Sequence, residues 1–81
     1  MSELSKEDIK DIQNSVSIKI GNKIRDIREK SGLTQTELAD RIQSDRQYMY
    51  KIESAKVGLS VGKLAVIAKA LNVELVELTD I

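Results

Sequence analysis

The chain has 81 residues, and its thirteen basic and thirteen acidic side chains give a formal net charge of zero. It is long enough for one domain with a small aliphatic core, since it contains no Phe or Trp. The absence of Cys and His removes disulfides, thiolate chemistry and the commonest general base and metal ligand. No apolar run suits a membrane span and the N-terminus is polar. We therefore predict a cytoplasmic protein with no membrane partner, no metal or other cofactor and no enzymatic activity.

The first predicted helix follows Ser5, where S-K-E-D carries a helix start signal with acidic residues in the first turn. Whether residues 6–30 form one helix or two with a break near 14–17 stays open, because VSIKI alternates like a strand. A lone strand would have no partner, so we predict helix. Gly32 is predicted to cap its end. The apolar residues at helical spacing are Ile9, Ile12, Val16, Ile20, Ile24 and Ile27.

Residues 33–53 predict two short helices joined by a tight turn. Thr34 and Glu37 form a T-x-x-E capping box, in which each side chain bonds the other residue's backbone N–H. Asp45 is predicted to cap the second helix, with the apolar Met49 and Ile52 pointing inward because three residues span nearly one turn. The outer face then consists of polar side chains suited to base edges and phosphates, namely Arg46, Gln47, Tyr50 and Lys51.

The last third of the chain predicts a loop and two more helices. Gly58 is the expected site of unusual backbone geometry in the loop at 54–60. Ser60 is predicted to cap a fourth helix, and Asn72 to close it in a left-handed conformation. The inner face of this helix consists of Leu64, Ile67, Ala68 and Leu71. A short fifth helix is predicted from Val73, Leu75, Val76 and Leu78.

Charge is distributed unevenly along the chain. Between residues 41 and 69 the sequence has six basic residues and two acidic ones, Asp45 and Glu53, whereas both ends are rich in acids. A neutral protein can therefore present a basic face, which is the electrostatic requirement for binding nucleic acid. The six basic residues are Arg41, Arg46, Lys51, Lys56, Lys63 and Lys69.

Several motifs between residues 20 and 76 together resemble one known family. They are I-G-x-x-I-R-x-x-R from Ile20, G-L-T-Q-x-E-L-A from Gly32, and S-x-x-x-L-x-x-I-A-K-A-L-x-V from Ser60. This pattern resembles the phage-repressor and Cro type (XRE family) of helix-turn-helix DNA-binding protein. The resemblance implies an all-α, compact five-helix bundle of the lambda-repressor-like type, with the third helix, at about 45–53, in the DNA major groove. Residues 1–16 are then a helical N-terminal extension and residues 17–81 the DNA-binding domain with a C-terminal dimerisation segment.

The resemblance also implies roles for individual residues. Arg28 and Glu53 match a buried structural ion pair of the family. Arg46, Gln47 and Lys51 match its recognition positions, and we expect Tyr50 beside them on the groove side, so these four are the predicted base readers. Lys63 is a weaker candidate for phosphate contact. The predicted phosphate contacts are Thr34, Gln35, Tyr48, Ser54 and Lys56.

Two departures from the family pattern lie in the turn between the two short helices. Gln43 stands where the family usually has Gly, and Ser44 stands where it has an apolar residue. Both put the tilt of the next helix in question. The segment D-R-x-Y, from Asp45, further resembles the controller proteins of restriction–modification systems. Small antitoxins and Cro-like phage regulators of bacteria share the scaffold, so the subtype stays open.

The function that this resemblance implies is transcription regulation, repression included, by a homodimer on a palindromic operator of double-stranded DNA. RNA polymerase or a cognate protein is left open as a further partner. The alternative is an antitoxin-type or adaptor module whose main partner is another protein. Ile9, Ile12 and Val16 are expected either to cover the core or to extend the dimer interface. The predicted interface consists of Val73, Leu75, Val76, Leu78 and Ile81.

Overall fold

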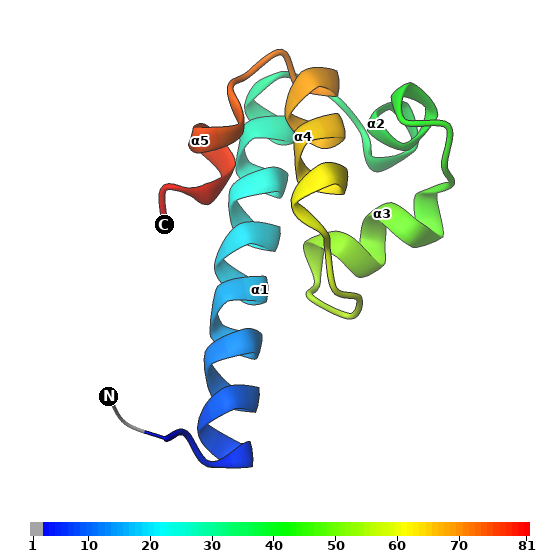
Figure 1. Cartoon of the computed structure of the whole chain (residues 1–81). Coiled ribbons are helices and arrows are strands. Elements are labelled where there is room, and N and C mark those ends of the chain that lie inside the picture. Colours follow the sequence, from blue (N-terminus) through cyan, green and yellow to red (C-terminus); the bar gives the residue numbers. More distant parts are fainter. Residues whose placement is uncertain (1–2) are drawn as a thin grey trace.

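The computed structural model describes residues 3–81 and contains helices but no strands within that range. Residues 1 and 2 of the predicted extension lie outside the described residues. Figure 1 shows the remaining helices gathered beside the C-terminal half of the first. The elements in chain order are α1 (Lys6–Lys30), α2 (Gln35–Arg41), α3 (Arg46–Glu53), α4 (Val61–Ala70) and α5 (Leu75–Thr79). The predicted all-α, five-helix class is confirmed.

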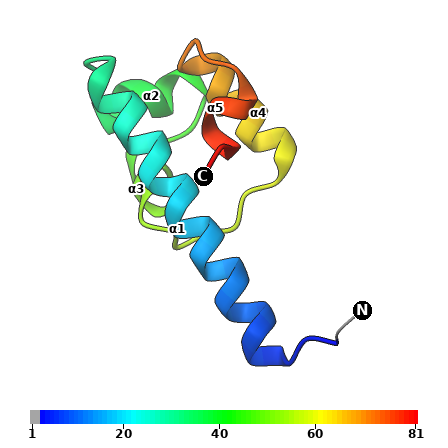
Figure 2. The ribbon, with the colours of Figure 1, turned by 90° about the vertical axis from the view of Figure 1, so that its left-hand side faces the viewer.

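Helix α1 is a single helix of 25 residues, which settles the question of a break near residues 14–17. Ser5 caps it as predicted, because its hydroxyl accepts from the Asp8 backbone N–H at 3.0 Å and its own N–H donates to the Asp8 carboxylate at 3.4 Å. The N-terminal half of α1 projects away from the body of the protein (Figure 2). We call residues 6–16 the arm; all of them are exposed.

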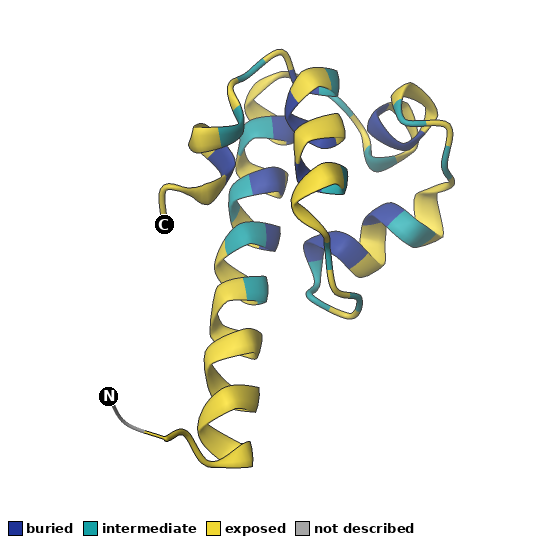
Figure 3. Cartoon of the chain, in the orientation of Figure 1, coloured by how far each residue is buried: buried dark blue, intermediate teal, exposed yellow. Residues whose placement is uncertain are grey.

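The core lies between the C-terminal half of α1 and the other four helices, and the buried positions in Figure 3 concentrate there. Helices α1 and α3 approach so closely that a Cβ atom on Gly21 would lie 2.7 Å from the Glu53 carbonyl oxygen. Glycine at this position is therefore a packing requirement. The buried hydrophobic residues are Ile24, Leu38, Ala39, Met49, Ile52, Leu64, Ile67, Ala68, Leu71 and Leu78.

Four helices end with the same backbone motif, in which one residue adopts positive φ just after the cap. These residues are Gly32 (75°), Gln43 (55°), Ala55 (59°) and Asn72 (60°). The predictions for Gly32 and Asn72 are confirmed. The prediction for Gly58 is wrong, since Ala55 takes the left-handed conformation in that loop. The reason is that α3 closes with the Lys56 N–H donating to the Lys51 carbonyl at 2.7 Å, which fixes the left-handed position directly before Lys56.

Helix α5 begins two residues later than the first residue expected in it. Val73 precedes the helix, and Glu74 is its N-cap, with the Glu74 N–H donating to the Glu77 carboxylate at 2.8 Å. Val73 is instead part of the motif that closes α4, because its N–H donates to the Ala68 carbonyl at 3.0 Å. The inclusion of Val73 in the fifth helix is therefore corrected.

Candidate nucleic-acid interface

The α2–turn–α3 unit is built by the capping residues that the sequence predicts. The Thr34 hydroxyl accepts from the Glu37 N–H at 3.0 Å, and the Glu37 carboxylate accepts from the Thr34 N–H at 2.9 Å. The Thr34 backbone N–H, followed by the Thr34 hydroxyl, stabilises the Glu37 carboxylate and holds the pKa of Glu37 below its ordinary value. Asp45 begins α3 by accepting from the Tyr48 N–H at 2.8 Å. Both helices of the unit therefore start at residues fixed by local chemistry.

The turn itself forms although it lacks glycine. Gln43 adopts the left-handed conformation, with φ 55°, and the Ser44 N–H donates to the Ala39 carbonyl at 2.9 Å. Ser44 is half-buried at the position where an apolar residue is usual in proteins of similar pattern. The departure at Gln43 thus leaves the helix-end geometry intact, at the cost of placing a side chain in a conformation that favours glycine.

Helix α3 has one buried and one exposed face. Met49 and Ile52 are buried as predicted, whereas the four residues on the other face are all exposed, with Tyr50 51 % exposed. No side chain of this outer face makes a hydrogen bond or ion pair with residues 3–81. Their donors and acceptors are consequently free for a ligand. The outer face consists of Arg46, Gln47, Tyr50 and Lys51.

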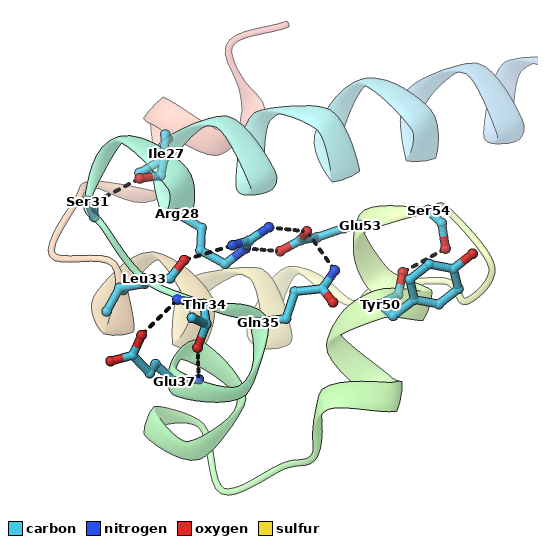
Figure 4. Close-up of polar contacts among 10 residues, drawn as sticks. All are labelled: Ile27, Arg28, Ser31, Leu33, Thr34, Gln35, Glu37, Tyr50, Glu53 and Ser54. Carbon is cyan, nitrogen blue, oxygen red and sulfur yellow. Dashed lines mark hydrogen bonds and ion pairs between the residues drawn. The ribbon is translucent and has the colours of Figure 1, made fainter.

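A buried ion pair fixes α3 against the rest of the protein (Figure 4). Arg28 Nε donates to Glu53 Oε2 at 2.6 Å and Nη2 donates to Oε1 at 3.0 Å. Arg28 Nη1 also donates to the Leu33 carbonyl at 2.7 Å, and the Gln35 amide donates to Glu53 Oε1 at 3.1 Å. The hydrogen bonds that Arg28 donates to the Glu53 carboxylate raise the pKa of Arg28. The two residues predicted as an ion pair are thus joined, and they connect α1, α2 and α3.

The residues predicted to contact phosphate lie around this unit, and some of their side chains already make hydrogen bonds within the protein. Gln35 is half-buried and its amide nitrogen already donates to Glu53. The Ser54 hydroxyl donates to the Tyr50 carbonyl at 2.6 Å (Figure 4). The Thr34 hydroxyl accepts from the Glu37 N–H within the capping box, and Thr34 is exposed. Lys56 is exposed.

Tyr48 has a contact that the sequence did not reveal. It is half-buried and packs against the core, and the Lys63 ammonium lies 5.6 Å from the centre of its ring. That distance is within the range of a cation–π interaction, which connects α3 to the first turn of α4. No local pattern relates residues fifteen positions apart, so only the fold brings them together. Lys63 consequently lies beside a predicted phosphate contact.

The local charge agrees with a surface that accepts an anion. Of the two acids between residues 41 and 69, Glu53 is buried against Arg28, and the Asp45 carboxylate caps α3. The basic residues Arg46, Lys51 and Lys56 are exposed. The side of the protein formed by the outer face of α3 and the turn that follows it is therefore basic, although the whole chain is neutral.

The residues predicted for dimerisation fall into three classes. Val76 and Ile81 are exposed, whereas Val73 and Leu75 are half-buried and pack against the core. Leu78 is fully buried, so its place in the predicted interface is corrected: its side chain has no surface to offer a partner. On the arm, Ile9, Ile12 and Val16 are exposed and thus do not cover the core.

No helix among residues 3–81 is long and apolar enough to cross a membrane.

Two capped helices joined by a tight turn, with the second presenting a free polar face, define a helix-turn-helix protein. The chain belongs to the helix-turn-helix family HTH_3, whose model matches residues 24–78. It is 38 % identical over 66 residues to the control protein C.MunI of a Mycoplasma species, an alignment that covers 80 % of this chain and 89 % of that protein. The predicted family is thereby confirmed.

Two further comparisons agree with this assignment. The chain is 39 % identical over 62 residues to an uncharacterised HTH-type transcriptional regulator of Rickettsia conorii, RC0668, covering 76 % of this chain but only 50 % of that protein. Its structure is similar to that of the restriction–modification controller protein C.AhdI of Aeromonas hydrophila, with a TM-score of 0.75 and 31 % identity. That comparison covers 79 % of this chain and 97 % of C.AhdI, so this chain extends beyond the controller's length.

Proposed function

We propose that this protein is a sequence-specific transcriptional regulator that binds double-stranded DNA as a homodimer on a palindromic operator. The observation that carries the proposal is the outer face of α3, whose four polar side chains are exposed and free of partners within residues 3–81. An α-helix fits the major groove, where each base pair presents a distinct set of donors and acceptors. Membership of the helix-turn-helix family supports this use of the face.

Within the proposed complex, Arg46 is the principal base reader. Its guanidinium stands at the first turn of α3, where recognition helices contact base edges, and it can donate two hydrogen bonds to guanine O6 and N7. Gln47 can pair with adenine, and Tyr50 and Lys51 lie on the same exposed face. The buried ion pair of Arg28 and Glu53 would hold α3 at the angle that this readout needs.

Phosphate contacts would come from the residues around α2 and from the turn after α3. Lys56 and Thr34 are exposed, and Tyr48 lies beside Lys63. The Gln35 amide nitrogen has two protons, and one of them is donated to Glu53. The second proton would donate to phosphate. The Ser54 hydroxyl would exchange its present bond to Tyr50 for one to DNA. These contacts set register and salt dependence but carry no sequence information.

The proposed subtype is a restriction–modification controller. C.MunI and C.AhdI are controllers by name, and each is covered over most of its own length by this chain. The DNA-binding activity of such a homodimer depends on its concentration through the monomer–dimer equilibrium. The proposal places the protein in the cytoplasm with the DNA, and RNA polymerase would be the further partner if the regulator activates transcription.

Selection of bound duplexes from a random pool tests the proposal. The wild-type protein should recover a palindromic consensus, and Arg46→Ala should lose preference at one base pair in each half-site. Arg25→Ala is the matched control, because Arg25 is an exposed arginine on α1 whose guanidinium bonds to Asn22 at 3.0 Å. It should recover the wild-type consensus. Failure of the wild type to recover any palindrome, or its purification with a second protein and without DNA affinity, would overturn the proposal in favour of a protein-binding module.

A further inference from the structure

The arm carries an aliphatic stripe that no other helix among residues 3–81 covers, although Ile12 and Val16 also line an open pocket beside loop residues 55–59. Ile9, Ile12 and Val16 follow one another at intervals of three and four, which places them on one side of a helix. They are 43 %, 51 % and 40 % exposed. Figure 3 shows the whole arm exposed, in contrast to the other half of the same helix. Three large aliphatic side chains aligned in water indicate a contact surface.

The helical state of the arm points to the same conclusion. Most helical stability in proteins comes from the packing of an apolar face, and isolated helices shorter than about 12–15 residues are marginal in water. The arm is about three turns long and is held by the Ser5 cap at one end and the body of the protein at the other. A partner on the stripe would supply the packing that the chain itself leaves out.

The stripe continues toward the exposed C-terminal residues. Ile81 is 48 % exposed and lines one shallow pocket with Lys19 and Lys23, which lie along α1 directly beyond Val16. Figure 2 faces this side of the molecule, where α1 runs beside α5 and the C-terminus. The exposed aliphatic residues of the C-terminal segment are Val76 and Ile81 alone. Two exposed aliphatic side chains make a small apolar patch, which the stripe on the arm would enlarge toward the roughly 800 Å² that each partner of a stable complex buries.

We propose that the arm is an interface for a second copy of this chain, in which two arms pack antiparallel about a two-fold axis between Ile12 and Val16. This inference rests on the homodimer of the proposed function and locates its interface. The stripe of one copy meets the same stripe of the other, as a two-fold contact requires. Leu4, which is 53 % exposed, then reaches the height of the partner's Ile81. The arm and the exposed C-terminal residues thus form one continuous interface.

Charge favours the antiparallel orientation. Asp8 lies about 9 Å before the proposed axis and Lys19 about 7.5 Å beyond it, at 1.5 Å per residue. Each Asp8 therefore lies near the Lys19 of the other copy. Acids gather at the start of α1, with Glu7 in the first turn, and bases follow at Lys19 and Lys23. A parallel pair would place acid against acid, whereas the antiparallel pair also opposes the helix dipoles favourably.

Sedimentation equilibrium without DNA tests the stripe with a matched pair of variants. Ile12→Glu places a charge in the proposed contact, and Ile18→Glu places the same charge at a residue that is also 51 % exposed. Ile18 lies about 150° around α1 from the middle of the stripe, at 3.6 residues per turn. Ile12→Glu should raise the dimer Kd at least tenfold, and Ile18→Glu should stay within about twofold of the wild type. Equal effects of the two variants, or none from Ile12→Glu, overturn the interface.

Disulfide trapping tests the orientation, since the native chain contains no Cys. The double variant Asp8→Cys, Lys19→Cys should form a covalent dimer under mild oxidation, and each single variant should not. A covalent dimer from Asp8→Cys alone would indicate parallel arms, and no trapping in the double variant would equally reject this register. Circular dichroism of every variant confirms that α1 is retained.

The two proposals can fail separately. Loss of dimerisation by Ile12→Glu in a protein whose wild type selects no DNA would uphold the arm interface and reject the operator function. A wild type that selects a palindrome while Ile12→Glu remains dimeric would uphold the function and reject the arm. A wild type that is monomeric at all concentrations rejects both the homodimer and the arm.

Discussion

The guanidinium of Arg28 and the carboxylate of Glu53 form a buried ion pair through two hydrogen bonds, of 2.6 Å and 3.0 Å. Arg28 is 7 % exposed and Glu53 4 % exposed, so both charges have given up most of their water. Neither charge is tolerable there alone, because the cost of removing it from water is offset only by its partner and the added bonds. Both side chains are therefore needed to hold α3 in its position.

Removing one partner of this pair should strongly destabilise the fold. Glu53→Ala leaves the Arg28 guanidinium without its counter-charge and should lower the free energy of unfolding by about 3–5 kcal/mol, measured by urea denaturation. The double variant Arg28→Met, Glu53→Leu removes both charges and should recover most of that loss. A change below about 1 kcal/mol in Glu53→Ala would match an exposed pair and contradict the buried arrangement.

The turn between α2 and α3 should be improved by glycine. Gln43 has φ 55°, so Gln43→Gly should relieve left-handed strain and raise the free energy of unfolding by about 0.5–1 kcal/mol. Gly32→Ala is the converse, because φ is 75° and no atom lies within 4 Å of the added Cβ. Gly32→Ala should lower the free energy of unfolding by about 1 kcal/mol, through backbone strain alone. Thermal unfolding of both variants gives the signs, and a destabilised Gln43→Gly would mean that the glutamine side chain makes an unrecognised contact.

Two glycines in helices should respond oppositely to alanine. Gly21→Ala would bring a Cβ to 2.7 Å from the Glu53 carbonyl oxygen, so α1 and α3 must separate, at a cost of about 1–3 kcal/mol. Gly62→Ala meets nothing nearer than the Ser60 hydroxyl at 3.8 Å and should stabilise α4 by about 0.5–1 kcal/mol. Chemical denaturation of the two variants compares them directly. A neutral Gly21→Ala would show that the two helices have room to move apart.

The capping box of α2 should make stability depend on pH. The hydrogen bonds from Thr34 hold the pKa of Glu37 below its ordinary 4.5 in the folded state. This contribution is therefore complete above pH 4.5 and is lost as pH falls through the lower folded-state pKa. NMR titration should show the Glu37 pKa rising part of the way toward its ordinary value in Thr34→Val, because this change removes the hydroxyl but keeps the backbone N–H of residue 34. An unchanged Glu37 pKa in Thr34→Val would contradict the contribution of the hydroxyl.

The features that could be predicted from sequence are those fixed within a few residues. Ser5, Thr34 and Asp45 cap their helices because a side-chain oxygen reaches an N–H three positions later, whatever the rest of the chain does. The inward positions of α3 follow equally from helical spacing. The Arg28–Glu53 ion pair is predicted only from the family resemblance, because the two residues are far apart in the sequence. Asn72 was predicted from its tolerance of positive φ.

The errors came from features that depend on more distant parts of the chain. Gly58 was chosen for its residue type, but the closing bond of α3 gives the left-handed position to Ala55. Leu78 was assigned to a surface because it is apolar, yet tertiary packing buries it completely. For the segment 16–20 the predicted helix is correct, and the structure adds only that the helix is continuous through it. The roles of Arg46 and its neighbours toward DNA stay predictions, because they depend on a partner.

Base-reading and phosphate-contacting residues should separate in DNA-binding assays. Arg46→Ala should cost about 1–3 kcal/mol on the preferred operator and little on an operator changed at its base pair, so discrimination falls. Lys56→Ala should weaken binding to all sequences alike. It should also reduce the magnitude of the slope of log K against log salt by about 1, because the loss of one phosphate contact means that about one counterion fewer is released on binding. Both residues are exposed, so neither change should alter stability beyond about 0.5 kcal/mol. Fluorescence anisotropy over a salt series measures both effects. If the two variants lost affinity in parallel on every sequence, Arg46 would be a phosphate contact, and the base reading would have to come from Gln47, Tyr50 and Lys51.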